Sequence, residues 1–130
     1  MTSEDIQLIQ QSWEKVEFVK DVAADLFHER LLELAPALGP LFAPDASVRR
    51  QKFAHFVATT VRGLDHPEAM RNVARELGVR HPEFAANDEH HTHVAAALLW
   101  TLQKCLRREF TPEVRGAWIN AYGNLASSMR

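Results

Sequence analysis

The stretch MRNVARELGVRH, residues 70–81, carries the pattern that decides how this chain folds. Four of its residues recur three or four positions apart and therefore share one helical face: Met70, Ala74, Leu77 and His81. An imidazole at the end of an apolar stripe can present one ring nitrogen to a metal in the core. Its other nitrogen can donate to a backbone carbonyl one turn earlier, around Leu77. On the pattern alone, a cap or an ordinary polar contact is the commoner role for such a histidine.

The same helical spacing of apolar residues extends on both sides of this stretch, and no convincing alternation of apolar and polar residues interrupts it. Proline, glycine and capping residues divide the chain into six or seven helices with short connections. The first expected helix follows a cap on Thr2 or Ser3, and the next two cover residues 20–35 and 36–42. A fourth runs from a cap on Asp45 or Ser47 to Leu64, and a fifth covers residues 68–81. The last two run from a cap on Asn87 or Asp88 to Leu106 and from Thr111 to Met129. PEFAAND, residues 82–88, is expected to be a loop. The pattern predicts one all-α domain over residues 1–130, with orthogonally packed helices.

Charge, cysteine content and the length of apolar runs limit which partners and which cellular compartment we expect for this protein. Fifteen basic and seventeen acidic residues give a net charge of −2, which gives no reason to expect nucleic acid or an anionic membrane as a partner. The single cysteine excludes an internal disulfide, and MTSEDIQLIQ, residues 1–10, lacks the zones of a signal peptide. The longest apolar run, VAAALLW at 94–100, is too short to span a bilayer. We expect a cytoplasmic protein, as a monomer or a homodimer.

Several kinds of catalytic site find no support. The five glycines are scattered singly, so no phosphate-binding loop is present, and no local signature of a Ser-His-Asp or Cys-His site is recognisable. The acidic pairs Glu4-Asp5 and Asp88-Glu89 stand at expected helix starts, where they complement the helix dipole.

Six segments resemble one protein family when taken together in order. They are LIQQSWEKV, FHERLLELAPALGPLF, RRQKFAHFVATTVRGLD, ARELGVRH, HHTHVAAALLWTL and FTPEVRGAWINAYGNLASSM, and they cover essentially the whole chain. The chain resembles the single-domain bacterial globins, which are related to the haem domains of flavohaemoglobins. The resemblance implies a globin-like fold with haem b (iron protoporphyrin IX) between the helix of Phe53 and the helix of His81. It also implies a diatomic gas ligand (O₂, NO or CO) for transport, scavenging or sensing.

The resemblance also assigns roles to individual residues. His81 falls on the proximal iron ligand, and Phe42 falls on the aromatic residue that packs against the porphyrin. Lys52 is a candidate for contact with a haem propionate. The residues expected to contact the cofactor are Phe42, Lys52, Phe53, Leu77, His81, Val94 and Leu98.

The distal side departs from the family pattern, which usually has a tyrosine and a glutamine that hydrogen-bond the ligand. The aligned residues are His28 and Arg49, and Phe53 replaces the usual leucine and narrows the pocket. His28 can donate to a ligand or bind the iron directly as a second axial residue; the alternative is a neutral histidine without ligand contact. Arg49 is expected at the surface or facing a propionate.

The sequence also departs from the family pattern at two places around His81. Pro82 disfavours α geometry at the preceding residue, so the helix is expected to stop at or before His81. His91 aligns with a tyrosine that surrounds the proximal histidine in flavohaemoglobins, and the chain ends near the position of their glutamate. We expect a weaker electron push on the iron. These 130 residues contain no flavin or nicotinamide domain, and we expect any reduction to need an external reductase.

Three alternatives stay open. EHHTH, residues 89–93, contains no pair of histidines four apart, although His90 and His93 share a face and can bind a transition ion weakly. We favour solvated histidines there, with His91 near the proximal pocket. For function, the alternatives to gas binding are nitric oxide dioxygenation with an external reductase and a haem-free globin-like sensor or interaction module; an enzyme is the less favoured choice.

Overall fold

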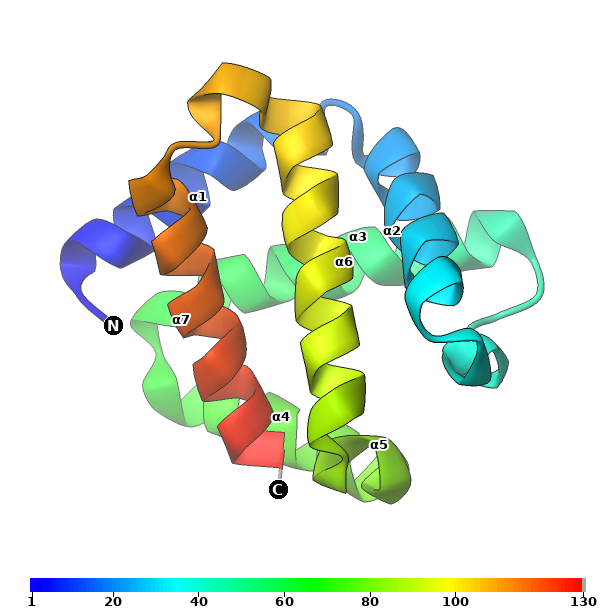
Figure 1. Ribbon diagram of the computed structural model, residues 1–130. Helices are drawn as coiled ribbons and strands as arrows, with labels where there is room; N and C mark the ends of the chain where they lie inside the picture. Colours follow the sequence, from blue (N-terminus) through cyan, green and yellow to red (C-terminus); the bar gives the residue numbers. More distant parts are fainter. Residues whose placement is uncertain (130) are drawn as a thin grey trace.

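The computed structural model describes residues 1–129, and over that range the chain folds into seven α-helices and three short 3-10 helices, without a strand (Figure 1). The elements are α1 (Ser3–Glu17), α2 (Lys20–Leu34), η1 (Pro36–Leu41), α3 (Ala46–Arg62), η2 (Gly63–Asp65), α4 (Pro67–Arg80), α5 (Pro82–Ala86), α6 (Asp88–Leu106), η3 (Arg107–Glu109) and α7 (Pro112–Met129). Several of the helices cross at steep angles, and α6 lies between α2 and α7. The all-α prediction is confirmed.

Side-chain caps explain why the helices begin where they do. Thr2 and Asp5 form a reciprocal capping box at the start of α1, with hydrogen bonds of 3.1 and 3.2 Å. Asp45 accepts from the third residue of α3, Asn87 does the same for α6, and Thr111 for α7. These contacts confirm the predicted starts of four helices.

The prediction that residues 82–88 form a loop is wrong over most of that segment. Pro82–Ala86 forms α5, and Asp88 already belongs to α6. Pro82 occupies the first helical position, where its fixed φ suits a helix and its missing N–H is not needed. The proline therefore ends α4 and also begins the next helix.

The core has three clusters of buried side chains. The largest joins α1, α3, α6 and α7, and in it Ile9 and Leu102 are almost completely buried. Trp118 of α7 donates its indole N–H to the hydroxyl of Ser12 on α1, at 2.9 Å, which satisfies the polar atom of this buried ring. The second cluster lies between α2, η1 and α6, and the third between α4, α5 and α7.

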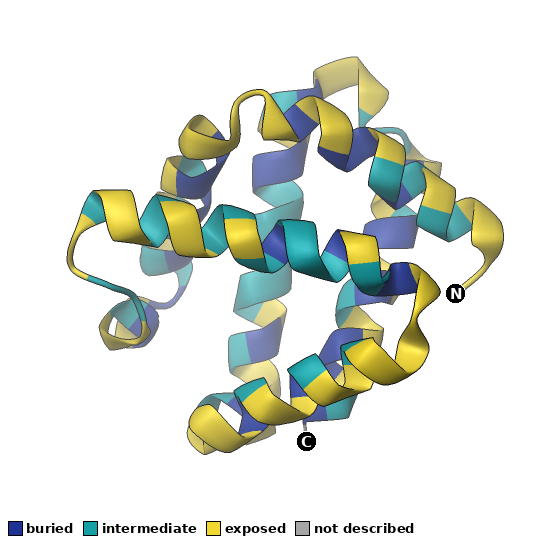
Figure 2. Cartoon of the chain, turned by 180° about the vertical axis from the view of Figure 1, so that it is seen from behind, coloured by how far each residue is buried: buried dark blue, intermediate teal, exposed yellow. Residues whose placement is uncertain are grey.

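α3 and α4 meet at η2 and diverge from it, as Figure 2 shows from behind. α2 packs on α3 and α6, whereas α4 packs on α7 and α5. The second cluster therefore lies on the side of the fold formed by α2, η1 and α3, and the third lies on the side formed by α4, α5 and α7. We call these two sides the arms of the fold. α6 contacts both. Within residues 1–129 no helix has the combination of length and apolarity that crossing a bilayer requires.

Gly78 allows α4 to lie directly against α7. A Cβ atom at this position would overlap the backbone carbonyl of Met129 near the end of α7. His81 follows three residues later, so the depth at which α4 packs on α7 also sets the position of its imidazole. Glycine is required here for close approach of two helices.

The change Gly78→Ala is expected to lower the free energy of unfolding by roughly 1–3 kcal/mol, because the two helices must separate to admit the methyl group. Urea denaturation followed by circular dichroism measures the change. The matched control is Gly116→Ala on α7, where a Cβ meets no atom within 4 Å and stability is expected to stay equal or rise. Unchanged stability of the Gly78 variant would contradict the close approach.

Candidate functional site

A cavity of about 300 Å³ lies between the two arms of the fold. Its walls come from α2, η1 and α3 on one side and from α4, α5 and α7 on the other, with α6 behind. Every residue predicted for the site contributes to its lining: His28, Phe42, Arg49, Lys52, Phe53, Leu77, His81, Val94 and Leu98. The sequence therefore anticipated which residues would come together, although they span 71 positions of the chain.

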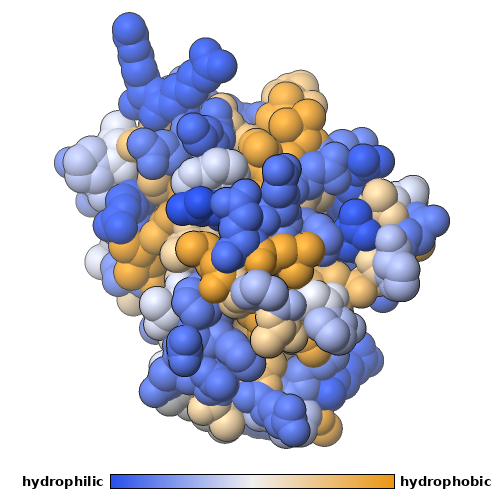
Figure 3. Space-filling model, turned by 45° about the vertical axis from the view of Figure 1, so that its right-hand side comes forward, coloured by the Kyte–Doolittle hydropathy of each residue, from blue (hydrophilic) through white to orange (hydrophobic). Residues whose placement is uncertain are grey.

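The lining is mostly apolar. Ala24, Leu31 and Leu38 join it from the second cluster, and Leu125 and Met129 join it from the third. Figure 3 turns the side of Figure 1 that carries α2 and η1 forward, and hydrophobic side chains gather in the middle of that face, surrounded by hydrophilic ones. The cavity thus suits a flat, largely apolar group with a polar edge.

His81 stands at the junction of α4 and α5. α4 ends at Arg80, as Pro82 predicts, and His81 has φ −132° and ψ 64°. Its ring is half-buried and lines the cavity. The backbone N–H of His81 donates to the carbonyl of Leu77 at 3.0 Å.

The expected hydrogen bond from the His81 ring to the Leu77 carbonyl is not present. That carbonyl accepts the main-chain N–H of His81, which is the last i→i−4 bond of α4. Among residues 1–129 the ring nitrogens of His81 have no hydrogen-bond partner. Both remain available to a group in the cavity.

Aromatic rings form the opposite wall. Phe27 lies 5.1 Å from Phe53 and 6.5 Å from Phe42 between ring centroids. The His28 imidazole meets the edge of Phe42 at 5.3 Å. Phe42 directly follows η1, as expected, and its position depends on Pro36, which begins that element. These contacts hold His28 against the cavity wall.

His28 is held in its neutral form by its surroundings. Burial lowers the pKa of the His28 imidazole, and the nearby Arg49 guanidinium lowers it further, while Asp25 acts weakly in the opposite direction. The folded protein therefore binds this proton more weakly than the unfolded chain does. Stability is lost as the pH falls through the ordinary histidine range and is retained above it. A neutral imidazole has one N–H donor and one lone pair.

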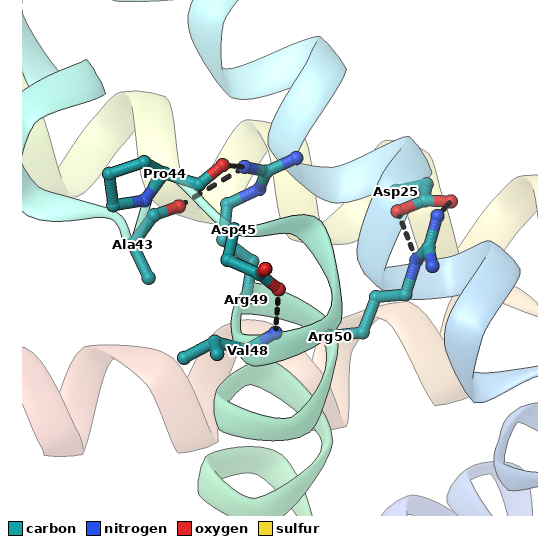
Figure 4. A network of polar contacts seen from close by, with 7 residues as sticks. All are labelled: Asp25, Ala43, Pro44, Asp45, Val48, Arg49 and Arg50. Carbon is teal, nitrogen blue, oxygen red and sulfur yellow. Dashed lines mark hydrogen bonds and ion pairs between the residues drawn. The ribbon is translucent and has the colours of Figure 1, made fainter.

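Arg49 and Lys52 bring positive charge to the edge of the cavity. Figure 4 shows Arg49 turned toward the segment before α3, where one guanidinium nitrogen donates to the carbonyls of Ala43 at 3.1 Å and Pro44 at 2.7 Å. These bonds leave other guanidinium donors free. Lys52 is exposed one turn further along α3. Both side chains suit the carboxylates of a bound group.

The neighbouring Arg50 joins α3 to α2. Its guanidinium makes two hydrogen bonds to Asp25, at 2.9 and 3.0 Å (Figure 4). Arg50 holds the pKa of the Asp25 carboxyl below its usual range. The pair is exposed to solvent, so it contributes little to stability, and it joins the two helices that carry His28 and Arg49.

A buried polar pair near the proximal side was missed from the sequence. The histidines of residues 89–93 were expected to be solvated, with His91 near the proximal pocket. His91 is buried, with Nδ1 2.9 Å from the Tyr122 hydroxyl and Nε2 3.0 Å from the Ala85 carbonyl. It packs at 4.7 Å on Phe84, which lines the cavity. Tyr122 also lines the cavity, and burial raises the pKa of its phenol. The helical stripe of α7 predicted a buried Tyr122, but not its partner on another helix.

His90 and His93 do not form a strong metal site. Both are half-buried, and His90 stacks on Phe84 at 6.1 Å. In the part of the chain that the structure describes, no group of three or more histidine, cysteine, aspartate or glutamate side chains gathers at metal-binding distance. A histidine pair without a third ligand binds a transition ion only weakly.

The residues of the cavity fit a haem. The donor set is one imidazole with unpartnered nitrogens, His81, and a neutral imidazole, His28, on the other arm of the fold. Apolar and aromatic side chains supply the flat walls, and Arg49 and Lys52 supply cations at the edge. Imidazole is the usual proximal ligand of haem iron in globins.

The change Arg49→Gln is expected to raise the pKa of His28 toward its ordinary value, because the repulsive charge beside the imidazole is removed. Histidine-resolved NMR titration measures this pKa. Arg62→Gln, at the far end of the same helix, is the matched control and leaves it unchanged. Equal values in all three proteins would show that burial alone lowers the pKa of His28.

Comparison with known proteins places the chain in one family. The Globin family model matches residues 27–129. Two rice proteins named anaerobic nitrite reductase NSHB5, from Oryza sativa subsp. indica and japonica, are 28% and 27% identical over 130 residues, covering 95% of this chain and 90% of each relative. Neuroglobin-1 of Oncorhynchus mykiss is 27% identical over 143 residues, covering 99% of this chain and 90% of that protein. The closed form of the HGbRL globin domain is 36% identical, with a TM-score of 0.44, and the match covers 99% of this chain and 94% of that one.

The named relatives from rice and trout leave the resemblance to flavohaemoglobins a prediction. The family match spans the elements from the second half of α2 to the end of α7, including every residue that lines the cavity on α3, α4, α5 and α6. The all-α arrangement agrees with the match, as does the helical spacing that first pointed to it. The chain belongs to the globin family.

Proposed function

We propose that the chain is a haem b globin that takes a diatomic gas in the cavity, with His81 as the proximal iron ligand. The observation that carries this proposal is the ring of His81, which lines an apolar cavity and has no hydrogen-bond partner among the described residues. An imidazole nitrogen that no protein group uses is free to bind a metal in the cavity. The matching family supports haem as that ligand.

An iron porphyrin, when bound, supplies a metal centre that takes O₂, NO or CO as a ligand. The chain supplies everything around it. His81, just after the end of α4, would hold the group, and Phe42 and Phe53 would pack against it. Leu77, Val94 and Leu98 would shield it from water. Lys52 and the free donors of Arg49 neutralise carboxylates at its edge.

The distal role falls to His28. Its imidazole is neutral, so it donates one hydrogen bond to a ligand that carries partial negative charge. Phe27 and Phe53 form the rest of this wall and leave no second neutral donor beside it. We propose that His28 discriminates polar ligands such as O₂ from nearly apolar ones such as CO.

A second candidate is redox chemistry on nitrogen oxides. The rice relatives carry the name anaerobic nitrite reductase, and the position of Arg49 and His28 favours an anion: a guanidinium and an imidazole N–H line the same cavity. Nitrite reduction takes one electron and two protons and yields nitric oxide and water; nitric oxide dioxygenation consumes nitric oxide and O₂ and yields nitrate. Either reaction needs an external reductase. Anaerobic nitric oxide formation from nitrite, measured with a reductant, tests the first reaction, and nitrate formation from nitric oxide and O₂ tests the second.

The change His81→Ala is expected to abolish stoichiometric hemin binding, seen as loss of the Soret band. His66→Ala is a close control: His66 and His81 flank the two ends of α4, each precedes a proline, and their backbone angles are similar, but His66 is exposed and does not line the cavity. Retention of the band in the His81 variant would refute proximal ligation. A wild-type melting temperature unmoved by hemin would instead favour a haem-free module.

The change His28→Leu is expected to speed O₂ dissociation by about fivefold, which corresponds to one hydrogen bond of about 1 kcal/mol. CO dissociation is expected to stay nearly unchanged, because CO carries little charge to stabilise. Stopped-flow ligand replacement measures both rates on the same sample. A ferric low-spin spectrum that becomes high-spin in this variant would show His28 bound to the iron instead.

A further inference from the structure

A second space in the molecule is a groove where the start of α1, η2, the start of α4 and the second half of α7 meet. Its volume is about 630 Å³, which suits a small molecule. We refer to it as the α4–α7 groove. Among the described residues that line it, only Leu125 also lines the cavity. The groove is therefore a space of its own, and the proposed function makes no use of it.

The lining of the groove changes from apolar to polar along each helix. On α7, Ala121, Asn124, Leu125 and Ser128 lie three or four residues apart, so they share one helical face. Ala121 and Leu125 are buried, Ser128 is half-buried and Asn124 is exposed. The groove therefore has an apolar floor beneath a polar rim. The side chains of the floor are Ile6, Leu64, Met70, Ala121 and Leu125.

Two charged side chains line the groove within residues 1–129, and only one of them has a partner. Asp65 of η2 accepts a long hydrogen bond of 3.5 Å from the amide of Gln10, which also donates to the carbonyl of Val61 at 3.4 Å. Arg71 of α4 is exposed and has neither a hydrogen bond nor an ion pair with any described residue. The charge left for a ligand in this groove is therefore positive.

Neutral hydrogen-bond donors line the same groove as Arg71. The side chains of Asn124, Ser127 and Ser128 belong to α7 and have no hydrogen-bond partner in the described part of the chain. A guanidinium offers a carboxylate two parallel N–H groups, and an amide and hydroxyls can donate to the same oxygens. Over residues 1–129 the lining contains no histidine or cysteine, the usual ligands of transition metals. The chemistry of the rim favours an organic anion.

We propose that the α4–α7 groove binds a small carboxylic acid as its anion. The carboxylate pairs with Arg71 and accepts from the amide or hydroxyl donors of α7. A short apolar body lies over the floor, against Leu64, Met70 and Leu125. The inference does not rest on the proposed function, because neither His81 nor His28 lines the groove.

Hexanoate and hexan-1-ol are matched probes, because they share a six-carbon chain and differ in the charge of the head group. NMR titration of the full chain follows the backbone amide shifts of Arg71, Asn124 and Ser128. Both probes are expected to shift these amides saturably, with hexanoate binding roughly fivefold more tightly, as expected for a well-formed exposed ion pair. Equal affinities for the two probes would overturn the carboxylate site.

The change Arg71→Gln removes the unpaired cation and keeps hydrogen-bond donors in its place. The affinity for hexanoate is expected to fall to that for hexan-1-ol. Arg75→Gln is the matched control, because Arg75 is an exposed residue one turn further along α4 that lines neither the groove nor the cavity. Hexanoate affinity that falls equally in both variants, or in neither, would refute the pairing with Arg71.

Chain length tests the apolar floor. Butanoate has two methylenes fewer than hexanoate and the same head group, so it is expected to bind roughly fourfold more weakly or less tightly still, because less apolar surface leaves water. Equal affinities for butanoate and hexanoate would show that the floor takes no part and would overturn this half of the proposal.

The cavity also carries cations, so the titration includes Arg49→Gln. Hexanoate binding is expected to survive this change, with and without hemin. Loss of binding in Arg49→Gln together with retention in Arg71→Gln would place hexanoate in the cavity and overturn the groove site. If hemin fails to bind while the Arg71 pattern holds, the proposed function is wrong and the groove site stands. If the pattern is absent while hemin binds, the groove site is wrong and the proposed function stands.

Discussion

A proline at position 82 prevents the preceding residue from continuing α4, and the candidate site depends on that constraint. The residue so displaced is His81. His81 still makes the last main-chain bond of α4, to the carbonyl of Leu77, but the backbone turns there, and the ring lines the cavity with both nitrogens unused among residues 1–129.

The remaining structure keeps a space open in front of this imidazole. α3 and α4 separate from η2 onward, and the aromatic cluster of Phe27, Phe42 and Phe53 stiffens the far wall. Gly78 seats α4 against α7, so that the near wall is equally fixed. Charge is confined to one edge of the cavity, whereas the wall toward α6 and α7 contains the hydrogen bond between His91 and Tyr122. The same fold therefore gives the cavity a charged edge beside walls that are mostly apolar.

Local chemistry explains how much of this was predictable. Caps at Thr2, Asp45 and Asn87 and the stop at Pro82 depend on neighbours within a few residues, so the sequence predicts them directly. The residues lining the cavity were anticipated because family resemblance aligns them along the chain. Whether His81, Phe42 and His28 act on a haem stays a prediction, since a lining residue need not bind the group.

The misses have a different cause: they depend on packing between distant segments. The hydrogen bond between His91 and Tyr122 joins residues 31 positions apart, and no local sequence pattern around either residue predicts it. Arg49 turns to two carbonyls that precede its helix, a choice among several partners that only the folded loop decides. α5 was missed because its five residues are too few for a periodic pattern.

The proposal that His81 binds iron in the cavity between the two arms of the fold is open to a direct crystallographic test. Crystals of the hemin-reconstituted protein, measured with X-rays on either side of the iron absorption edge, locate the iron atom without reference to any expected geometry. We expect a single strong anomalous peak at coordination distance from a ring nitrogen of His81, inside the space bounded by Phe42 and Leu98. A peak beside His90 or His93, or hemin bound on the outer surface with the cavity closed by side chains, would contradict it.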